Sequence, residues 1–178
     1  MNFSIVLNAI YDGTSGRSKF KGVLIDDADK FPMVHKKSIE SAASSIGIQL
    51  SSPNCSRDAF AISLICGLLT AEEGILSLLY SIIKDPKFMI AGGSAGDDLK
   101  FKATSVSYNG KVSENGAVIL FVKTSCKFKI YKENIFKRTG KTVMLTGVNP
   151  ESHTVTSIDG QNPKKRYAQV VGFFGQPC

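Results

Sequence analysis

The chain has 178 residues, of which 43 % are hydrophobic and 21 % are charged, and its formal net charge is +7. This balance excludes a disordered chain, and the length suits one domain, residues 1–178, with a substantial hydrophobic core. No uninterrupted apolar stretch approaches the roughly 20 residues of a membrane-spanning helix. The first ten residues lack a basic leader and are interrupted by polar residues. We therefore expect a cytoplasmic globular domain.

The four cysteines stand alone in the sequence. None belongs to a C-x-x-C pair, and no histidine is close enough to complete a zinc site. A disulfide framework is not typical of a chain of this size and hydrophobicity. We predict free thiols and no metal site, with Cys66 buried as a small hydrophobic residue.

In the first third of the chain, alternating and apolar runs predict strands at residues 3–8, 20–25 and 58–66. A turn-rich segment, residues 12–16, separates the first two. Apolar residues at helical spacing predict a helix over residues 34–46, and Gly47 follows it where a C-cap is expected. Strands and helices are therefore mixed in this part of the chain.

A second helix is predicted after Thr70. Thr70 and Glu73 fit a capping box, in which each side chain accepts a backbone N–H at the helix start. The apolar residues that follow lie on one helical face and end before Asp85-Pro86. They are Ile75, Leu78, Leu79, Ile82 and Ile83.

The glycine-rich run that begins at Gly92 is the main candidate for a binding site. The apolar residues 88–91 lead into Gly-Gly-Ser-Ala-Gly-Asp-Asp, which ends at Asp98. Glycine permits positive φ and close backbone approach, so the run predicts a tight turn after a buried strand. Backbone N–H groups of such a turn can hold a carboxylate, and Asp97 can hold an amine.

The rest of the chain predicts short strands and one helix. Turns are expected at Asn109-Gly110, Asn149-Pro150 and Asp159-Gly160, and residues 117–123 have the apolar composition of a central strand. Further strands are predicted at residues 102–108, 127–132, 142–148 and 153–158. A helix is predicted to close this part of the chain, with Asn162 as N-cap, Pro163 at its first position and Gly172 past its end. This back half is predicted to be a meander, and the fold class is α+β with a mixed, mainly antiparallel sheet.

Single motifs suggest two other functions, a hydrolase and a haem protein. Gly92-x-Ser94-x-Gly96 matches the nucleophile elbow of hydrolases, with His153 as the only base in the right chain order, but the motif needs a helix after the serine and a β pattern follows. A Ser94-dependent hydrolase is therefore the alternative, and no catalytic residue is assigned. His35 and His153 are the only histidines for haem ligation, and neither has a C-x-x-C-H context. We expect no cofactor, with haem as the one alternative.

The basic residues suggest a further alternative, an interaction or nucleic-acid-binding module. They are spread along the chain, with one cluster at Lys164-Lys165-Arg166. In residues 127–131 the lysines alternate with apolar residues, which is typical of a solvated strand face. Because no helix-turn-helix pattern or interleaved aromatic residues accompany these charges, we do not expect nucleic acid as a partner.

Several short motifs, taken in order, resemble the FIST domain family. The resemblance covers residues 58–172, and two groups of motifs carry it. The first is Gly92-Gly-Ser-Ala-Gly-Asp-Asp98, then Phe101-x-x-Thr104-x-Val106, Asn109-Gly110-x-Val112 and Gly116-Ala-Val118; the second is Thr139-Gly-Lys141, Ile158-Asp-Gly160 and Pro163 with Tyr167 and Gly172.

This resemblance implies a sensory domain of a signal-transduction protein that binds a small molecule such as an amino acid and has no catalysis of its own. It also implies a downstream partner such as a kinase or chemotaxis transducer. The family's C-terminal half would follow Gly172, so we expect the chain to be the N-terminal part of a longer sensor. The candidate ligand-binding residues are Gly92, Gly93, Ser94, Gly96, Asp97, Asp98 and Thr104.

Overall fold

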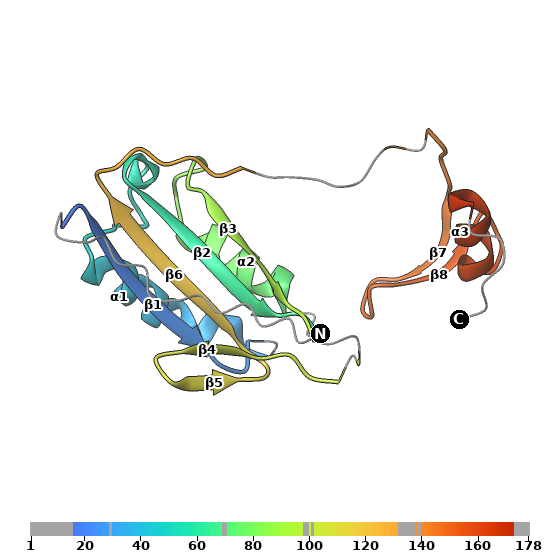
Figure 1. Cartoon of the computed structure of the whole chain (residues 1–178), viewed down its shortest axis with the longest axis horizontal. Coiled ribbons are helices and arrows are strands. Elements are labelled where there is room, and N and C mark those ends of the chain that lie inside the picture. The colour runs from blue at the N-terminus through green and yellow to red at the C-terminus, as the bar shows by residue number, and fades with distance from the viewer. Residues whose placement is uncertain are drawn as a thin grey trace. The chain divides into compact units, whose positions relative to one another are not determined.

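The computed structural model describes residues 16–28, 30–68, 71–97, 100, 102–131, 138 and 140–172. The chain divides into two compact units, Met1–Ile130 and Tyr131–Cys178, and each is described by itself (Figure 1). Helices and mixed, mostly antiparallel strands make the protein α+β, as predicted. The strand predicted at residues 3–8 lies outside the described residues.

The first unit is built on a four-stranded sheet with the order β1-β6-β2-β3 (Figure 1). The strands are β1 (Ser18–Ile25), β2 (Ala59–Cys66), β3 (Ile90–Ala95) and β6 (Ala117–Thr124). β6 is antiparallel to both of its neighbours, β1 and β2, whereas β3 is parallel to β2. The central position of β6 agrees with its apolar sequence, but the predicted meander is wrong, because β6 returns to lie between two strands from the start of the chain.

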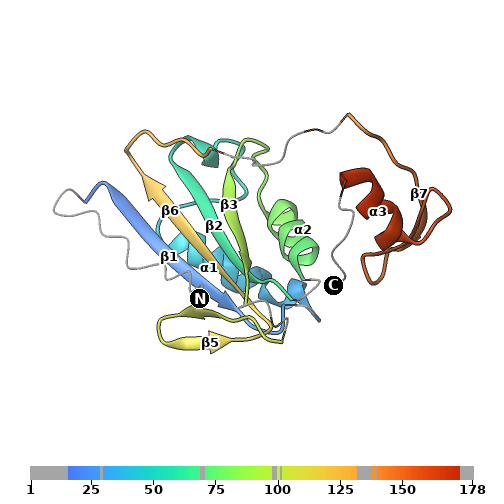
Figure 2. The ribbon, with the colours of Figure 1, turned by 45° about the vertical axis from the view of Figure 1, so that its right-hand side comes forward.

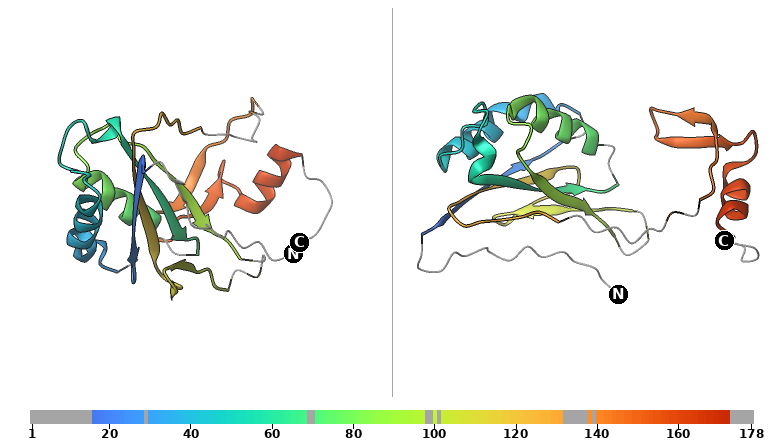
Figure 3. Two further views of the ribbon diagram at one scale, coloured as in Figure 1. Left: turned by 60° about the vertical axis from the view of Figure 1, so that its left-hand side comes forward. Right: turned by 90° about the horizontal axis from the view of Figure 1, so that it is seen from above.

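Both long helices of the first unit cover the same face of this sheet, as Figure 3 shows in the view from above. They are α1 (Lys36–Ser45), which follows the 3-10 helix η1 (Pro32–His35), and α2 (Glu72–Ile82), which connects the parallel strands β2 and β3 (Figure 2). The core lies between the helices and the sheet, where Ile39 of α1, Leu79 of α2 and Phe121 of β6 are fully buried.

The capping box predicted from Thr70 and Glu73 falls partly outside the described residues. The residue before the helix is Ala71, whose side chain makes no cap hydrogen bond, and Thr70 lies outside the described residues. The predicted apolar face is confirmed, because Ile75, Leu78 and Leu79 are all buried. Burial of this face therefore positions α2 against the sheet.

A two-stranded hairpin, β4 (Val106–Tyr108) and β5 (Lys111–Ser113), lies beside β1 (Figure 1). The predicted turn is confirmed, since Asn109 and Gly110 have φ values of 50° and 79°. The Tyr108 hydroxyl accepts a hydrogen bond from the Gly22 N–H at 3.2 Å. A Cβ at Gly22 would lie 2.4 Å from the Tyr108 ring, so this contact requires glycine at that position.

The second unit contains β7 (Leu145–Asn149), β8 (Thr154–Ile158) and α3 (Pro163–Val171). The caps of α3 are confirmed: the Asn162 side chain accepts from the Lys165 N–H at 3.2 Å, and Gly172 has φ 83°. The Asp159 carboxylate joins the hairpin to the helix, since it accepts from the Met144 N–H at 2.8 Å and from Arg166 Nε at 2.7 Å. These hydrogen bonds hold the pKa of Asp159 below its ordinary value.

The strand predicted at residues 127–132 is wrong over the residues that the structure describes, 127–131, which have no regular structure. The alternation in exposure is nevertheless present: Lys127 and Lys129 are exposed, and Phe128 is half-buried with its ring centre 4.7 Å from that of Phe60. No described strand pairs with this segment, so the alternation does not reflect a place in a sheet.

Candidate functional site

The glycine-rich run is a strand and not the predicted turn. Gly92 and Gly93 lie inside β3, with Gly92 in register with Ser63 of the parallel strand β2. A Cβ at Gly92 would lie 1.9 Å from the Ser63 carbonyl oxygen. The missing side chain therefore lets β3 approach β2 closely, which is the close-approach role of glycine and not its turn-forming role.

The arrangement around Ser94 does not form a nucleophile elbow. Ser94 is an exposed residue within β3, and residues 96, 97, 100 and 102–105 after it are not helical. The elbow places its serine on a sharp turn at a helix N-terminus, which is absent here among the described residues. His153 belongs to the second unit, where it occupies an exposed turn with φ 48°. His35 ends η1 in the first unit.

Two other predicted site residues make hydrogen bonds within loops. Asp97 Oδ2 accepts from the Lys102 N–H at 2.9 Å. The buried Thr104 hydroxyl accepts from the Leu68 N–H at 3.4 Å. Asp98 lies outside the described residues. The structure thus places Gly92, Gly93, Ser94, Gly96 and Asp97 along one sheet edge and its exit, with Thr104 in the loop that follows.

The cysteine thiols that the structure describes are free. Cys55 and Cys66 are buried, as predicted for Cys66, and Cys126 is exposed. Cys178 lies outside the described residues. Over the described part of the chain, no three His, Cys, Asp or Glu side chains gather where they could hold a metal ion.

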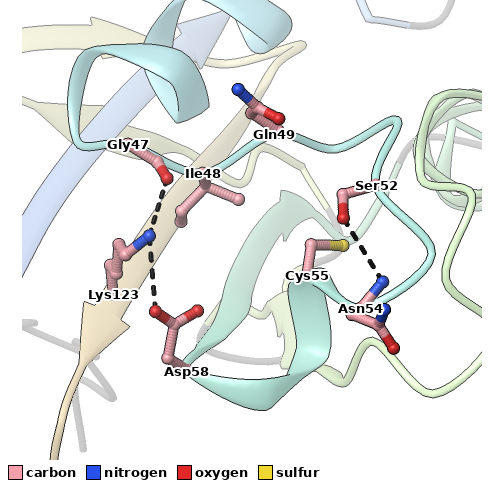
Figure 4. A pocket seen from close by; sticks show the side chains of 8 residues that line it. All are labelled: Gly47, Ile48, Gln49, Ser52, Asn54, Cys55, Asp58 and Lys123. Atoms are coloured by element: carbon pink, nitrogen blue, oxygen red, sulfur yellow. Dashed lines mark hydrogen bonds and ion pairs between the residues drawn. The ribbon is translucent and has the colours of Figure 1, made fainter.

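The first unit contains a small polar pocket that no sequence motif predicted (Figure 4). Its volume is about 190 Å³. The walls come from the loop after α1, from the 3-10 helix η2 (Cys55–Arg57), from the residue before β2 and from the end of β6. They consist of Gly47, Ile48, Gln49, Ser52, Asn54, Cys55, Asp58 and Lys123.

Charges of both signs lie side by side in this pocket. Lys123 Nζ donates to the Gly47 carbonyl oxygen at 2.7 Å and lies 3.3 Å from Asp58 Oδ2 (Figure 4). Both side chains remain partly exposed, so solvent weakens their attraction. Burial and the negative charge of Asp85 raise the pKa of the Cys55 thiol, which therefore stays protonated at neutral pH. The pocket thus offers one ammonium, one carboxylate and several neutral polar groups.

No local motif could have identified this pocket. Lys123 and Asp58 are far apart in the sequence, and they meet because β6 pairs with β2 in a register that places Lys123 opposite Ala59. Neither residue is exceptional in its own sequence neighbourhood, because isolated charges at strand ends are common on protein surfaces. Only the strand pairing brings them together.

The buried carboxylate of Asp85 holds η2, which forms one wall of the pocket, through a hydrogen bond from Ser56. Asp85 is 4 % exposed, and its two oxygens accept from the Ser56 N–H at 2.9 Å and from the Lys87 N–H at 3.0 Å. Hydrogen bonds from Ser56, and then from Lys87, hold the pKa of Asp85 below its ordinary value. The ionised form is therefore the one that stabilises this loop.

We predict a pH-dependent loss of stability when Asp85 is changed to asparagine. Because the pKa is lower in the folded state, the carboxylate stabilises the fold above its unfolded pKa of about 3.9, and this contribution disappears as the pH falls through the folded pKa. Asp85→Asn should therefore be less stable than the wild type at neutral pH, and the gap should shrink in acid. Urea unfolding at a series of pH values measures the gap; a gap independent of pH would contradict the prediction.

The first unit is a two-layer α+β structure with a small polar pocket. The family model of the FIST N domain matches residues 3–161, most of the chain. The chain therefore belongs to the FIST N domain family, whose members are sensory, non-catalytic domains of signalling proteins. No curated protein and no solved structure matches the chain. Among the described residues, no helix has the length and apolar character to span a membrane.

Proposed function

We propose that this chain is the ligand-binding part of a cytoplasmic signalling sensor and that its ligand is a small molecule such as an amino acid. The observation that carries the proposal is the family match over residues 3–161, which spans both units. In this proposal the chain performs no chemistry on the ligand. It passes the ligand-bound state to a downstream protein such as a kinase or a chemotaxis transducer.

The polar pocket supports an amino acid as the ligand. An amino acid carries an ammonium and a carboxylate on neighbouring atoms, and the pocket presents Asp58 and Lys123 as partners of opposite charge. A ligand carboxylate would take the place of Asp58 beside Lys123, while the ligand ammonium would bind Asp58. The volume of about 190 Å³ admits only a small ligand.

The end of β3 is the second candidate position for the ligand. Gly92, Gly93 and Ser94 expose backbone there, and Asp97 follows directly. Asp97 already accepts the Lys102 N–H, so an amine would share that carboxylate with the loop. Haem is a further candidate, for which His35 and His153 are the only histidine ligands in the sequence.

A thermal-shift screen against single amino acids, small carboxylates and haemin tests the proposal. A ligand that binds the folded state raises the melting temperature by mass action, by an amount that grows with its concentration. We expect an amino acid to raise the melting temperature, and absence of any shift across the set would contradict a ligand-binding function for this chain. A Soret band with haemin would favour haem.

Two variants distinguish the candidate positions. Lys123→Met keeps the length of the side chain and removes its charge, so it should abolish the amino-acid shift if the ligand occupies the pocket. Asp97→Ala should abolish the shift only if the ligand lies at the end of β3, and it is the matched control for the pocket. Isothermal titration of both variants, after a melt of each without ligand, separates loss of binding from loss of folding.

A further inference from the structure

In the part of the chain that the structure describes, the outer edge of β3 lacks the features that normally prevent pairing with another strand. β3 is the last strand of the sheet order, and no described residue pairs with its outer side. Its six residues, Ile90–Ala95, contain no charged residue and no proline, and they form an unbroken ladder with β2. Edge strands are normally protected by charges, prolines or bulges, so an edge without them is suited to strand addition.

The hydrogen bonds to β2 identify the backbone groups that this edge presents. The Met89 carbonyl accepts from the Ala61 N–H, and the Ala95 carbonyl accepts from the Gly67 N–H, both at 3.0 Å. The odd-numbered residues of β3 therefore direct their backbone hydrogen-bonding groups toward β2 and toward Gly67, the residue that follows β2. Because the pattern alternates along a strand, Ile90, Gly92 and Ser94 direct their N–H and C=O groups outward.

The opposite edge of the sheet, β1, differs in this respect. Lys19 and Lys21 are exposed on β1, and exposed lysines on an edge strand oppose pairing with a like strand. Like charges directly opposite each other destabilise a strand pair. Association of two sheets of this chain through an edge is therefore favoured at β3 and not at β1.

We propose that a second copy of this chain pairs with β3 in an antiparallel arrangement, with the two-fold axis at Gly92. A symmetric pair brings the same surface of both copies together, and antiparallel hydrogen-bonded pairs must match outward-facing residues with outward-facing residues. Placing Gly92 opposite Gly92 of the second copy satisfies this condition and also matches Ile90 with Ser94.

Charge complementarity supports this register. With Gly92 on the axis, Lys87 of each copy lies beyond the same end of the joined strands as Asp97 of the other, so that opposite charges meet near both ends. Lys87 is exposed and lies in a turn three residues before β3, and Asp97 is half-buried and lies two residues after it. The register fixed by the backbone is thus also the one that brings opposite charges together. This proposal does not depend on a ligand in the pocket around Lys123, whereas a ligand at the end of β3 would compete with the pairing of the two copies.

Sedimentation velocity over a range of protein concentrations tests the proposal, with Ser94→Pro and Ser94→Ala as a matched pair. Proline removes the outward N–H of residue 94, whereas alanine keeps it, and proline is tolerated where an edge N–H faces away from the sheet. We expect a dimer for the wild type and Ser94→Ala, and a monomer for Ser94→Pro at the same concentrations. A wild type that is monomeric throughout overturns the proposal.

A charge exchange tests the register without relying on the fold of the proline variant. Lys87→Glu and Asp97→Lys should each weaken the dimer, because each places like charges opposite each other at both ends. The double variant Lys87→Glu with Asp97→Lys restores opposite charges and should recover most of the dimer. Failure of the double variant to recover, with circular dichroism unchanged, overturns the proposed register.

Discussion

Replacing Gly92 with alanine is expected to destabilise the first unit by about 3 kcal/mol, as for overpacked sites at which the backbone must move. The added Cβ would lie 1.9 Å from the Ser63 carbonyl oxygen and 2.8 Å from its carbonyl carbon. These are backbone atoms of the neighbouring strand, so no side-chain rotation relieves the contact. Urea unfolding followed by circular dichroism measures the change, since the midpoint should fall markedly.

Gly93→Ala is the matched control for this experiment. Gly93 is the next residue of the same strand, and a Cβ there would meet no other atom within 4 Å. We expect its unfolding midpoint to stay close to that of the wild type. Equal destabilisation by the two substitutions would show that loss of glycine flexibility, and not close approach to β2, determines the stability of β3.

Replacing Phe121 with alanine is expected to cost about 4 kcal/mol, which is typical of a buried phenylalanine whose removal leaves a cavity. Phe121 is 0 % exposed and lies on β6 in the core between the sheet and the helices. Because β6 pairs with both β1 and β2, the cavity would weaken the centre of the sheet. Denaturant unfolding at a single protein concentration measures the loss.

Leu120→Ala provides the comparison on the same strand. Leu120 is half-buried and points to the opposite face of the sheet from Phe121, since successive side chains of a strand alternate. Its removal should cost clearly less than removal of Phe121. A larger loss for Leu120 would mean that the main core lies on the other face of the sheet.

Much of the local structure could be predicted from the sequence. The apolar face of α2, the turn at Asn109-Gly110 and both caps of α3 were predicted, and they depend on residues within a few positions of one another. Helical spacing, positive φ in a turn and side-chain caps are local properties, so the residue types suffice to predict them. The central place of β6 also followed from composition, because only a strand buried on both faces is continuously apolar.

The structural role of the glycine-rich run could not be predicted from neighbouring residues alone. Glycine is common both in turns and at close backbone approaches, and the sequence around Gly92 does not distinguish these uses. Ser63 on β2 distinguishes the two uses, because its carbonyl oxygen occupies the space beside Gly92 and makes this position a close backbone approach. Similarly, the alternating residues 127–131 carry a strand pattern but have no described partner strand to pair with.

The sequence by itself determined the fold class, the principal helices and turns, and the family to which the chain belongs, because these depend on local spacing and on motifs in order along the chain. The tertiary structure alone decided that β6 lies between β1 and β2 and that β3 is the last strand of the sheet among the described residues. It also decided that Asp58 and Lys123 share a pocket. Strand order and register join residues that are distant in sequence, and no local propensity specifies which strands pair.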